Sequence, residues 1–178
     1  KAGAFPLHIW LPTAHPAAPA PASAVLSGVI TKTGIYGVLV LSTTVFLHDK
    51  QWGMLLAVLG AVTMVLGAVL AVLSVDLKRT LACSSISQIG FILVGTAMLC
   101  LLGEHNALAV DGTILHILNH SLIKMVLFPA AGIIHLTTHS FDLNDIRGFG
   151  RGKPLLALVM GMPMLSLAGA PGLNGYVS

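Results

Sequence analysis

The sequence has 178 residues, of which 56% are hydrophobic and only 8% are charged. Soluble domains average about 25% charged residues, so this composition excludes an ordinary soluble domain and predicts an all-α, polytopic transmembrane helix bundle. The net charge of +3 rests on scattered residues, which excludes a nucleic-acid-binding surface. The two cysteines, Cys83 and Cys100, do not have the spacing of a redox or metal motif.

The N-terminal region is rich in proline. Residues 1–10 are expected to be the end of a preceding membrane helix, with Trp10 at the membrane interface. Four prolines follow between residues 12 and 21. Each interior proline removes a backbone donor and clashes with the turn before it, so we expect a folded re-entrant connector. His8 and His15 are expected to be solvated, and Ser23 to cap the next helix.

Apolar stretches then follow one another to the end of the chain. Because about 20 apolar residues cross the hydrocarbon core, the predicted spans are residues 23–47, 53–75, 81–102, 107–136 and 155–170. A polar turn is expected at 103–106, and Pro163 and Pro171 are expected to break the last segment. We expect one transmembrane domain over residues 1–178, as an internal piece of a larger protein.

The basic residues between the spans are unevenly distributed. If the connections alternate sides, only Lys50 lies on one side, and the other side holds Lys78, Arg79, Arg147, Arg151 and Lys153. Basic residues favour cytoplasmic loops. The sequence therefore predicts an integral protein of the prokaryotic inner membrane, with these five residues on the cytoplasmic side.

A line of polar side chains interrupts the span at 107–136. His116, His120 and Lys124 are spaced i, i+4, i+8, which places them on one stripe of a helix, about 12 Å long. A lysine near the middle of a membrane costs about 2.5–3.5 kcal/mol on insertion scales, so such a residue indicates a functional site. Lys32 is a second lysine inside a predicted span.

These groups are suited to taking up and releasing protons. Desolvation and neighbouring cations both disfavour a charged amine, and histidine titrates near neutral pH. No Asp or Glu lies at the depth of Lys32 or Lys124. Successive members of the line are about 6 Å apart along the helix, so water must bridge them. The line predicts a central relay that needs partners such as Lys32.

Other interpretations stay open. His116 and His120 could bind a metal, although there is no HExxH pattern and no third ligand at a recognisable spacing; either could also be a packing residue. The two lysines could extend to an interface. Pro129 could only kink its helix, or expose carbonyls to water. Four further polar side chains could join helices or line a water path: Ser84, Ser85, Ser87 and Gln88.

Several different short motifs lie along nearly the whole chain. They are KAG and FPLHIWLP within 1–12, PAPASA and KTGIYG within 19–37, DLKR to SSISQIG at 76–90, the stretch from Asn119-His120 to Lys124, and SLAG, Pro171 and NG within 166–175. Together they resemble the proton-conducting antiporter-like membrane subunits shared by respiratory complex I, Mrp-type sodium/proton antiporters and membrane-bound hydrogenases.

The resemblance implies a proton channel built on discontinuous, proline-broken helices. Lys1 resembles the lysine of the first broken helix, Lys32 the bridging lysine, and the line ending at Lys124 the central relay; Pro171 falls in the second broken helix. The implied protein is a proton-translocating subunit of a redox-driven complex of the NADH:quinone oxidoreductase or hydrogenase type.

An alternative is a subunit of an Mrp-type antiporter that exchanges protons for sodium ions. A third is a structural subunit whose lysines are silent. Other membrane subunits and lipid are the expected partners. We expect no cofactor, no metal and no catalytic centre in the chain itself, because it has no nucleotide loop, no cluster-ligand cysteines and no nucleophile arrangement.

Overall fold

The computed structural model describes residues 1–102 and 107–177, and every regular element in them is helical. In chain order the elements are α1 Trp10–Ala17, α2 Ala20–Val25, the π-helix η1 Leu26–Ile30, α3 Thr31–Thr44, α4 Lys50–Val72, α5 Leu77–Leu101, α6 Ala107–Thr138, α7 Pro154–Leu167 and α8 Asn174–Val177. The all-α prediction is confirmed. The turn expected at 103–106 lies outside the described residues.

Four helices are long and apolar enough to cross a membrane. They are α4, α5, α6 and the continuous helix made of α2, η1 and α3, which runs over Ala20–Thr44. Each exceeds the length of about 20 residues that spans the hydrocarbon core. α7, the last expected span, is also apolar but has only 14 residues. It rises about 21 Å.

The N-terminal region differs from the prediction. Residues 1–9 are not the end of a helix, because the first helix begins at Trp10. Gly3 has a φ of +80°, and a Cβ there would collide with the side chain of Leu11. The expected break in the proline-rich stretch falls between α1 and α2. Pro19 is extended and is the N-cap of α2, and Pro21 lies in the first turn, where proline is favoured because its missing N–H needs no partner.

Ser23 is inside α2 and does not cap it, so that prediction is wrong. Pro163 does not break α7 either; it lies within the helix. Transmembrane helices tolerate proline when neighbouring groups satisfy the freed carbonyls. The break comes later, between α7 and α8, where Gly169 and Gly172 adopt positive φ values of 73° and 85°.

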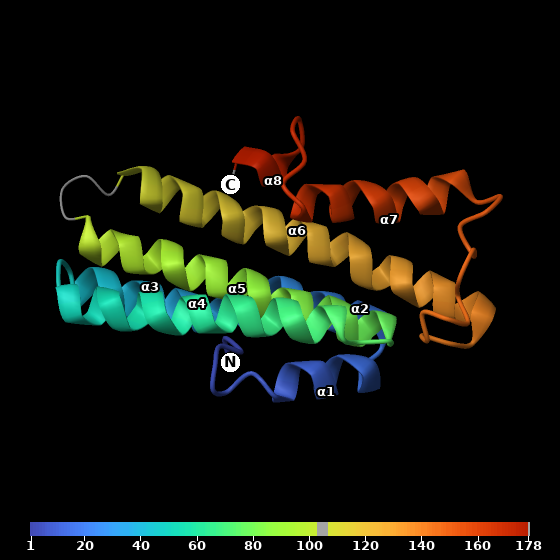
Figure 1. The fold of residues 1–178 in the computed structure, drawn as a ribbon, viewed down its shortest axis with the longest axis horizontal. Helices are drawn as coiled ribbons and strands as arrows, with labels where there is room; N and C mark the ends of the chain where they lie inside the picture. Colours follow the sequence, from blue (N-terminus) through green and yellow to red (C-terminus); the bar gives the residue numbers. More distant parts are fainter. Residues whose placement is uncertain (103–106, 178) are drawn as a thin grey trace.

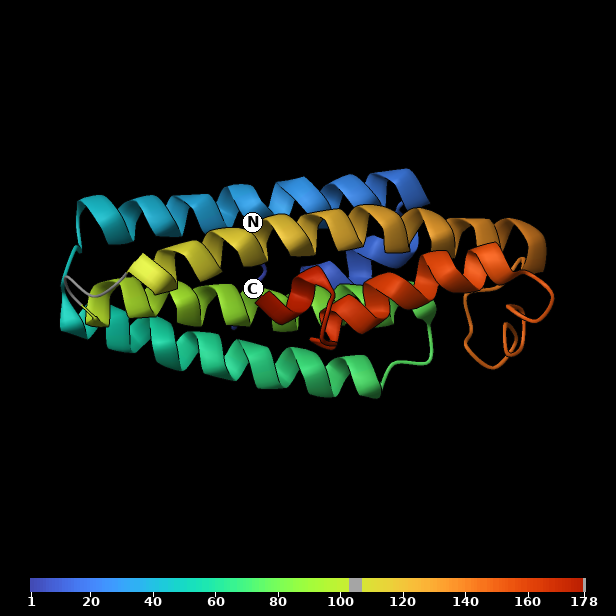
Figure 2. The ribbon, with the colours of Figure 1, turned by 90° about the horizontal axis from the view of Figure 1, so that it is seen from above.

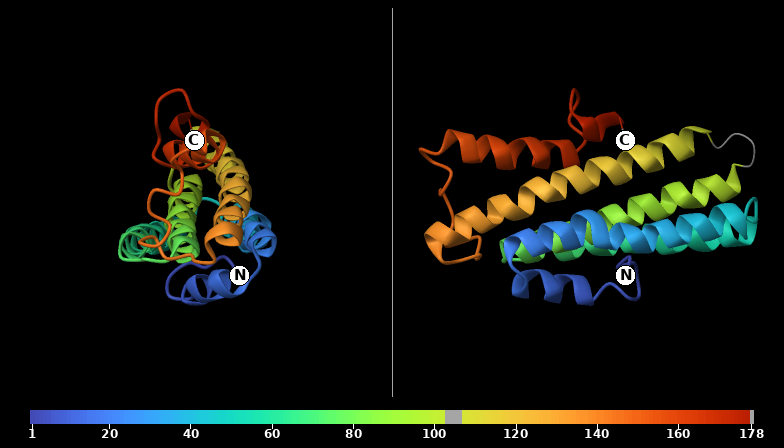
Figure 3. Two further views of the ribbon diagram at one scale, coloured as in Figure 1. Left: turned by 90° about the vertical axis from the view of Figure 1, so that its right-hand side faces the viewer. Right: turned by 180° about the vertical axis from the view of Figure 1, so that it is seen from behind.

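α5 is the centre of the bundle (Figure 1). In Figure 2, α4 lies along one side of α5, and α6 and then α3 lie along the other. The α4–α5 contact depends on glycines, because a Cβ at Gly67 would meet the backbone of Ser87, and a Cβ at Gly90 would meet that of Met64. Small residues allow membrane helices to approach this closely. The end-on view in Figure 3 shows α1 across the base of the bundle and α7 and α8 over the opposite face.

The two basic connections meet at one end of the bundle. Leu77 N donates to Phe141 O at 2.9 Å, and Leu143 N donates to Val75 O at 2.8 Å. The turn between α4 and α5 is therefore joined to the loop at 139–153. Lys78 does not point to solvent, because only 3% of it is exposed. That this end faces the cytoplasm stays a prediction.

Candidate functional site: a buried lysine and histidine network

Lys124 lies at the centre of α6 and is completely buried. Its ammonium donates to the Leu81 carbonyl at 2.8 Å and to the Ser84 hydroxyl at 2.5 Å. Both partners are on the first turns of α5. The Leu81 carbonyl also accepts from Ser85 Oγ at 3.0 Å. Lys124 is therefore held by neutral oxygen atoms of the neighbouring helix.

Lys32 and His120 are in direct contact although they lie on different helices. Lys32 Nζ is 2.6 Å from His120 Nδ1 and donates to the Ser27 carbonyl at 2.7 Å. His120 is 1% exposed. If its Nδ1 accepts from the lysine, the ring proton is on Nε2. Within the described part of the chain, that buried Nε2 atom has no hydrogen-bond partner.

The π-helix η1 shapes the Lys32 contact. The Ser27 carbonyl accepts from both Lys32 Nζ and Thr31 Oγ1, the latter at 2.9 Å. A π-turn interrupts the regular i→i+4 ladder and is frequent at functional sites. Gly28, also in η1, lies against Ser121 and Met125 of α6. The sequence signal for this contact is the Ser27-Gly28 pair within an otherwise apolar helix.

A pair of serine hydroxyls joins the two lysine groups. Ser27 Oγ and Ser85 Oγ are 2.8 Å apart, and both serines are fully buried. Ser27 lies beside Lys32, and Ser85 shares the Leu81 carbonyl with Lys124. The polar groups thus form one connected cluster across η1, α3, α5 and α6.

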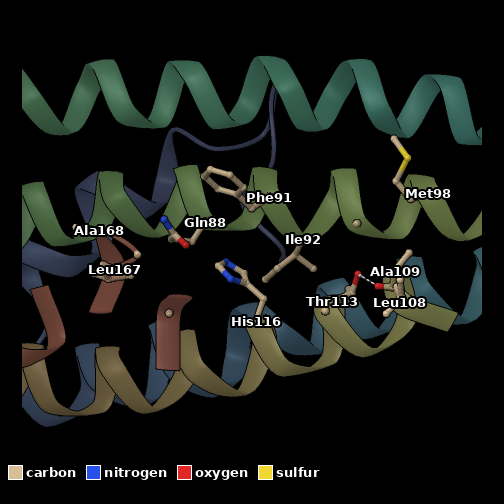
Figure 4. A pocket seen from close by; sticks show the side chains of 14 residues that line it. Gln88, Phe91, Ile92, Met98, Leu108, Ala109, Thr113, His116, Leu167 and Ala168 are labelled. Carbon is tan, nitrogen blue, oxygen red and sulfur yellow. Dashed lines mark hydrogen bonds between the residues drawn. The ribbon is translucent and has the colours of Figure 1, made fainter. Parts of the chain in front are cut away.

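His116 lies one turn from His120 and borders a pocket (Figure 4). This pocket has a volume of about 440 Å³ and extends past Gln88 and Thr113 to Leu108 near the start of α6. We call it the His116 pocket. The His116 ring lies 6.0 Å from the Phe91 ring, centre to centre.

A small cavity separates the two histidines from the break between α7 and α8. It has a volume of about 20 Å³ and is lined by His116, His120, Gln88 and other residues. A water needs about 10–15 Å³ of such volume and two or more polar partners, so this cavity suits one water molecule.

The break between α7 and α8 is fixed to α6. Asn119 Nδ2 donates to Asn174 O at 2.9 Å, and Gly175 N donates to Ser166 Oγ at 3.0 Å. Pro171 is exposed within the break. The second discontinuous element is therefore positioned beside the two histidines.

Some predicted site residues lie outside this cluster. Lys1 is exposed, and its neighbour Ala2 packs against Gly34, two residues beyond Lys32. Ser87 lies in the glycine-lined contact between α4 and α5. Pro129 stays within α6 and lines a separate pocket of about 620 Å³, together with Lys78 and Pro16. We call this the proline pocket.

The two N-terminal histidines are buried, and the prediction that they are solvated is wrong. His8 and His15 were expected to be solvated, but they are 9% and 0% exposed. His15 stacks on Phe128 of α6, with the ring centres 4.5 Å apart. α1 folds back against the bundle, which the proline count alone did not predict. In the described residues, no three His, Cys, Asp or Glu side chains converge as a metal site would require.

A helical membrane bundle with broken helices and buried lysines defines the class of antiporter-like membrane proteins. The NADH:quinone oxidoreductase/Mrp antiporter transmembrane family matches residues 1–178, and the chain belongs to this family. It is an integral membrane protein, as predicted.

Relatives come from several branches of the family. The chain is 39% identical to hydrogenase-4 component B of Escherichia coli, over all of this chain and 28% of that protein. It is 38% identical to an NAD(P)H-quinone oxidoreductase chain 4 of Synechococcus elongatus, over all of this chain and 32% of that protein. A subunit in the structure of the Mrp complex from Dietzia superposes with a TM-score of 0.91 and 30% identity, over 99% of this chain and 32% of that one. The chain thus spans about a third of the length of these relatives.

Proposed function

We propose that this chain moves protons within a membrane subunit of a redox-driven complex of the NADH:quinone oxidoreductase or hydrogenase type. Residues 1–178 form one transmembrane domain of that subunit. The observation that carries the proposal is the contact of 2.6 Å between Lys32 Nζ and His120 Nδ1. Both atoms can hold a proton, so the pair can exchange one directly between two helices.

The lysines are held in a way that keeps their protons exchangeable. Lys32 and Lys124 form hydrogen bonds to backbone carbonyls, a hydroxyl and an imidazole. A carboxylate would hold the proton by its opposite charge, whereas these neutral groups do not. Because a membrane-embedded lysine costs about 2.5–3.5 kcal/mol, two such lysines indicate a use for their charge.

The order of groups along α6 supports a path between two pockets. The His116 pocket reaches His116, and the proline pocket begins at Pro129. The helix rises about 20 Å between these residues. His120, Lys32 and Lys124 lie in this interval, and the cavity beside His116 suits the bridging water. Protein groups are therefore needed to transfer the proton only along the stretch of α6 between the two pockets.

The other predicted residues have supporting roles. Ser84 and Ser85 hold the Lys124 end, and Gln88 borders the water-sized cavity. Lys1 continues the relay beyond Lys32, towards residues of the full-length protein that are not in this chain. The proximity of Ala2 to Gly34 supports this role. Other membrane subunits of the complex are the expected partners.

A sodium/proton antiporter subunit is the second candidate. It is favoured by the TM-score of 0.91 to a subunit of the Mrp complex from Dietzia. The two candidates differ in what drives the proton. Membrane vesicles that hold the complex acidify on addition of NADH or hydrogen in the first case, and respond to a sodium gradient in the second.

The relay is tested by Lys124→Ala in the full-length protein within its complex. We expect proton movement into membrane vesicles, followed with a pH-sensitive dye, to fall about tenfold or more, as when an acid–base group is lost. Lys50→Ala is the matched control, because Lys50 is exposed at the start of α4. Unchanged proton movement with normal assembly of Lys124→Ala would leave the lysines with a structural role only.

A further inference from the structure

His15 is a buried polar group that the relay described above does not use. It lies in the last turn of α1, is 0% exposed, and stacks on Phe128 with ring centres 4.5 Å apart. In the described residues, neither of its ring nitrogens has a hydrogen-bond partner. An unpartnered buried polar atom loses its hydration without compensation. A packing role alone would be served better by phenylalanine or leucine.

His15 lies between the parts of the structure that hold two lysines, Lys124 and Lys78. Phe128 follows Lys124 by one helical turn, about 6 Å along the axis of α6, and His15 stacks on Phe128. On the other side, Lys78 Nζ donates to the Ala18 carbonyl at 2.7 Å, at the end of α1. Burial, together with the charges of Lys124 and Lys78, lowers the pKa of His15 to about 4. The imidazole is therefore neutral at pH 7.

Lys78 connects the position of His15 to the proline pocket. Lys78 lines that pocket together with Pro16 and Pro129. Its side chain is buried in the first turn of α5 and lies over the Phe141 ring, 4.5 Å from the ring centre. A cation at a helix N-terminus opposes the helix dipole. The contact with the end of α1 explains part of this placement, but it does not explain why His15 is a histidine.

We propose that His15 passes protons between Lys78, at the proline pocket, and Lys124. The inference rests on the proposed function and names the second connection of the same relay. One ring nitrogen accepts a proton from the Lys78 side while the other releases its proton towards the Lys124 amine. The ring stays neutral overall, and its tautomer is inverted. Rotation of the ring, or proton return in the reverse direction, restores the starting tautomer.

The test compares four variants of the full-length protein in its complex, with driven proton movement in vesicles as the measurement. Lys124→Ala is the reference for the proposed function. His15→Phe keeps the ring stacking on Phe128 but removes both nitrogens, and His15→Gln restores polarity without an imidazole. Lys78→Gln removes the donor on the pocket side. We expect all four to lower the rate about tenfold or more, with normal assembly of His15→Phe.

The outcomes separate the two proposals. If Lys124→Ala stops proton movement but His15→Phe keeps more than about half of it, the role of His15 is refuted and the proposed function stands. If Lys124→Ala is itself active, the proposed function fails. If His15 has only a structural role, His15→Phe keeps the normal rate of proton movement and His15→Gln does not. If His15→Phe does not assemble, Lys78→Gln decides the question. This variant lacks the donor that the step requires, so a normal rate of proton movement in Lys78→Gln would refute the role of His15.

Discussion

Replacing Lys32 by methionine removes the lysine from the contact between α3 and α6 at nearly constant side-chain volume. Lys32 Nζ lies 2.6 Å from His120 Nδ1, and this contact joins α3 to α6. Without Lys32, the acid–base groups left in the centre of the bundle are His116, His120 and Lys124 on α6. The first and last of these are about 12 Å apart along the axis, which is too far for direct transfer.

The effect on stability is the balance of two terms. His120 Nδ1 loses its partner, which costs about 1–3 kcal/mol for a buried acceptor. The Ser27 carbonyl keeps its hydrogen bond from Thr31 Oγ1, so it adds little. Removing a membrane-embedded cation gains about 2.5–3.5 kcal/mol on insertion scales. The two terms oppose each other, and we expect the free energy of unfolding to change by no more than about 2.5 kcal/mol.

The expected result is loss of function without loss of fold. Driven proton movement in vesicles should fall about tenfold or more, while the thermal unfolding midpoint stays within a few degrees of the wild type. Lys50→Met, an exposed lysine, should change neither quantity. Adding His120→Gln to Lys32→Met should reduce the rate little further, because groups that act as a unit are not additive. Normal proton movement in correctly assembled Lys32→Met would refute the direct transfer.

Three further predictions concern stability and are checked by denaturant or thermal unfolding of the full-length protein. Ser27→Ala and Ser85→Ala should each cost about 1 kcal/mol, and the double variant should show a coupling of about 0.5 kcal/mol or more; strict additivity would mean that the hydroxyls do not interact. Gly67→Ala should separate α4 from α5 and destabilise, whereas Gly37→Ala, with open space around it, should not. Asp49→Ala should cost about 0.5–2 kcal/mol because Asp49 caps α4, and Asp49→Asn should restore most of it.

The helices and the acid–base residues could be predicted from the sequence because their signals are local. An apolar run of about 20 residues indicates a span whatever surrounds it. The spacing of His116, His120 and Lys124 fixes their common face once the segment is helical. Lys32 was identified from its depth within a predicted span and from the KTGIYG motif that it begins. The partner of each side chain could not be predicted, because it depends on how the helices pack.

The residues that were missed illustrate this limit. Ser27 bonds to Ser85, which is 58 residues away, and a single serine in an apolar helix does not indicate such a partner. His15 looked like an interfacial histidine, but α1 folds back onto Phe128 and buries it. Ser23 has the character of a helix cap, but the N-cap of α2 is Pro19, four residues earlier, and the Ser23 hydroxyl donates to the His15 carbonyl instead.

The packing also changes what the polar line on α6 can do. His116 faces the pocket beside Phe91, His120 faces Lys32 of α3, and Lys124 faces α5. The three residues share a stripe, but His116 and Lys124 contact α5, whereas His120 contacts Lys32 of α3. A proton that uses these groups must therefore cross between helices instead of following α6. Because such transfers depend on donor–acceptor distances of about 2.6–3.2 Å, a small shift of η1 and α3 relative to α6 would interrupt the path.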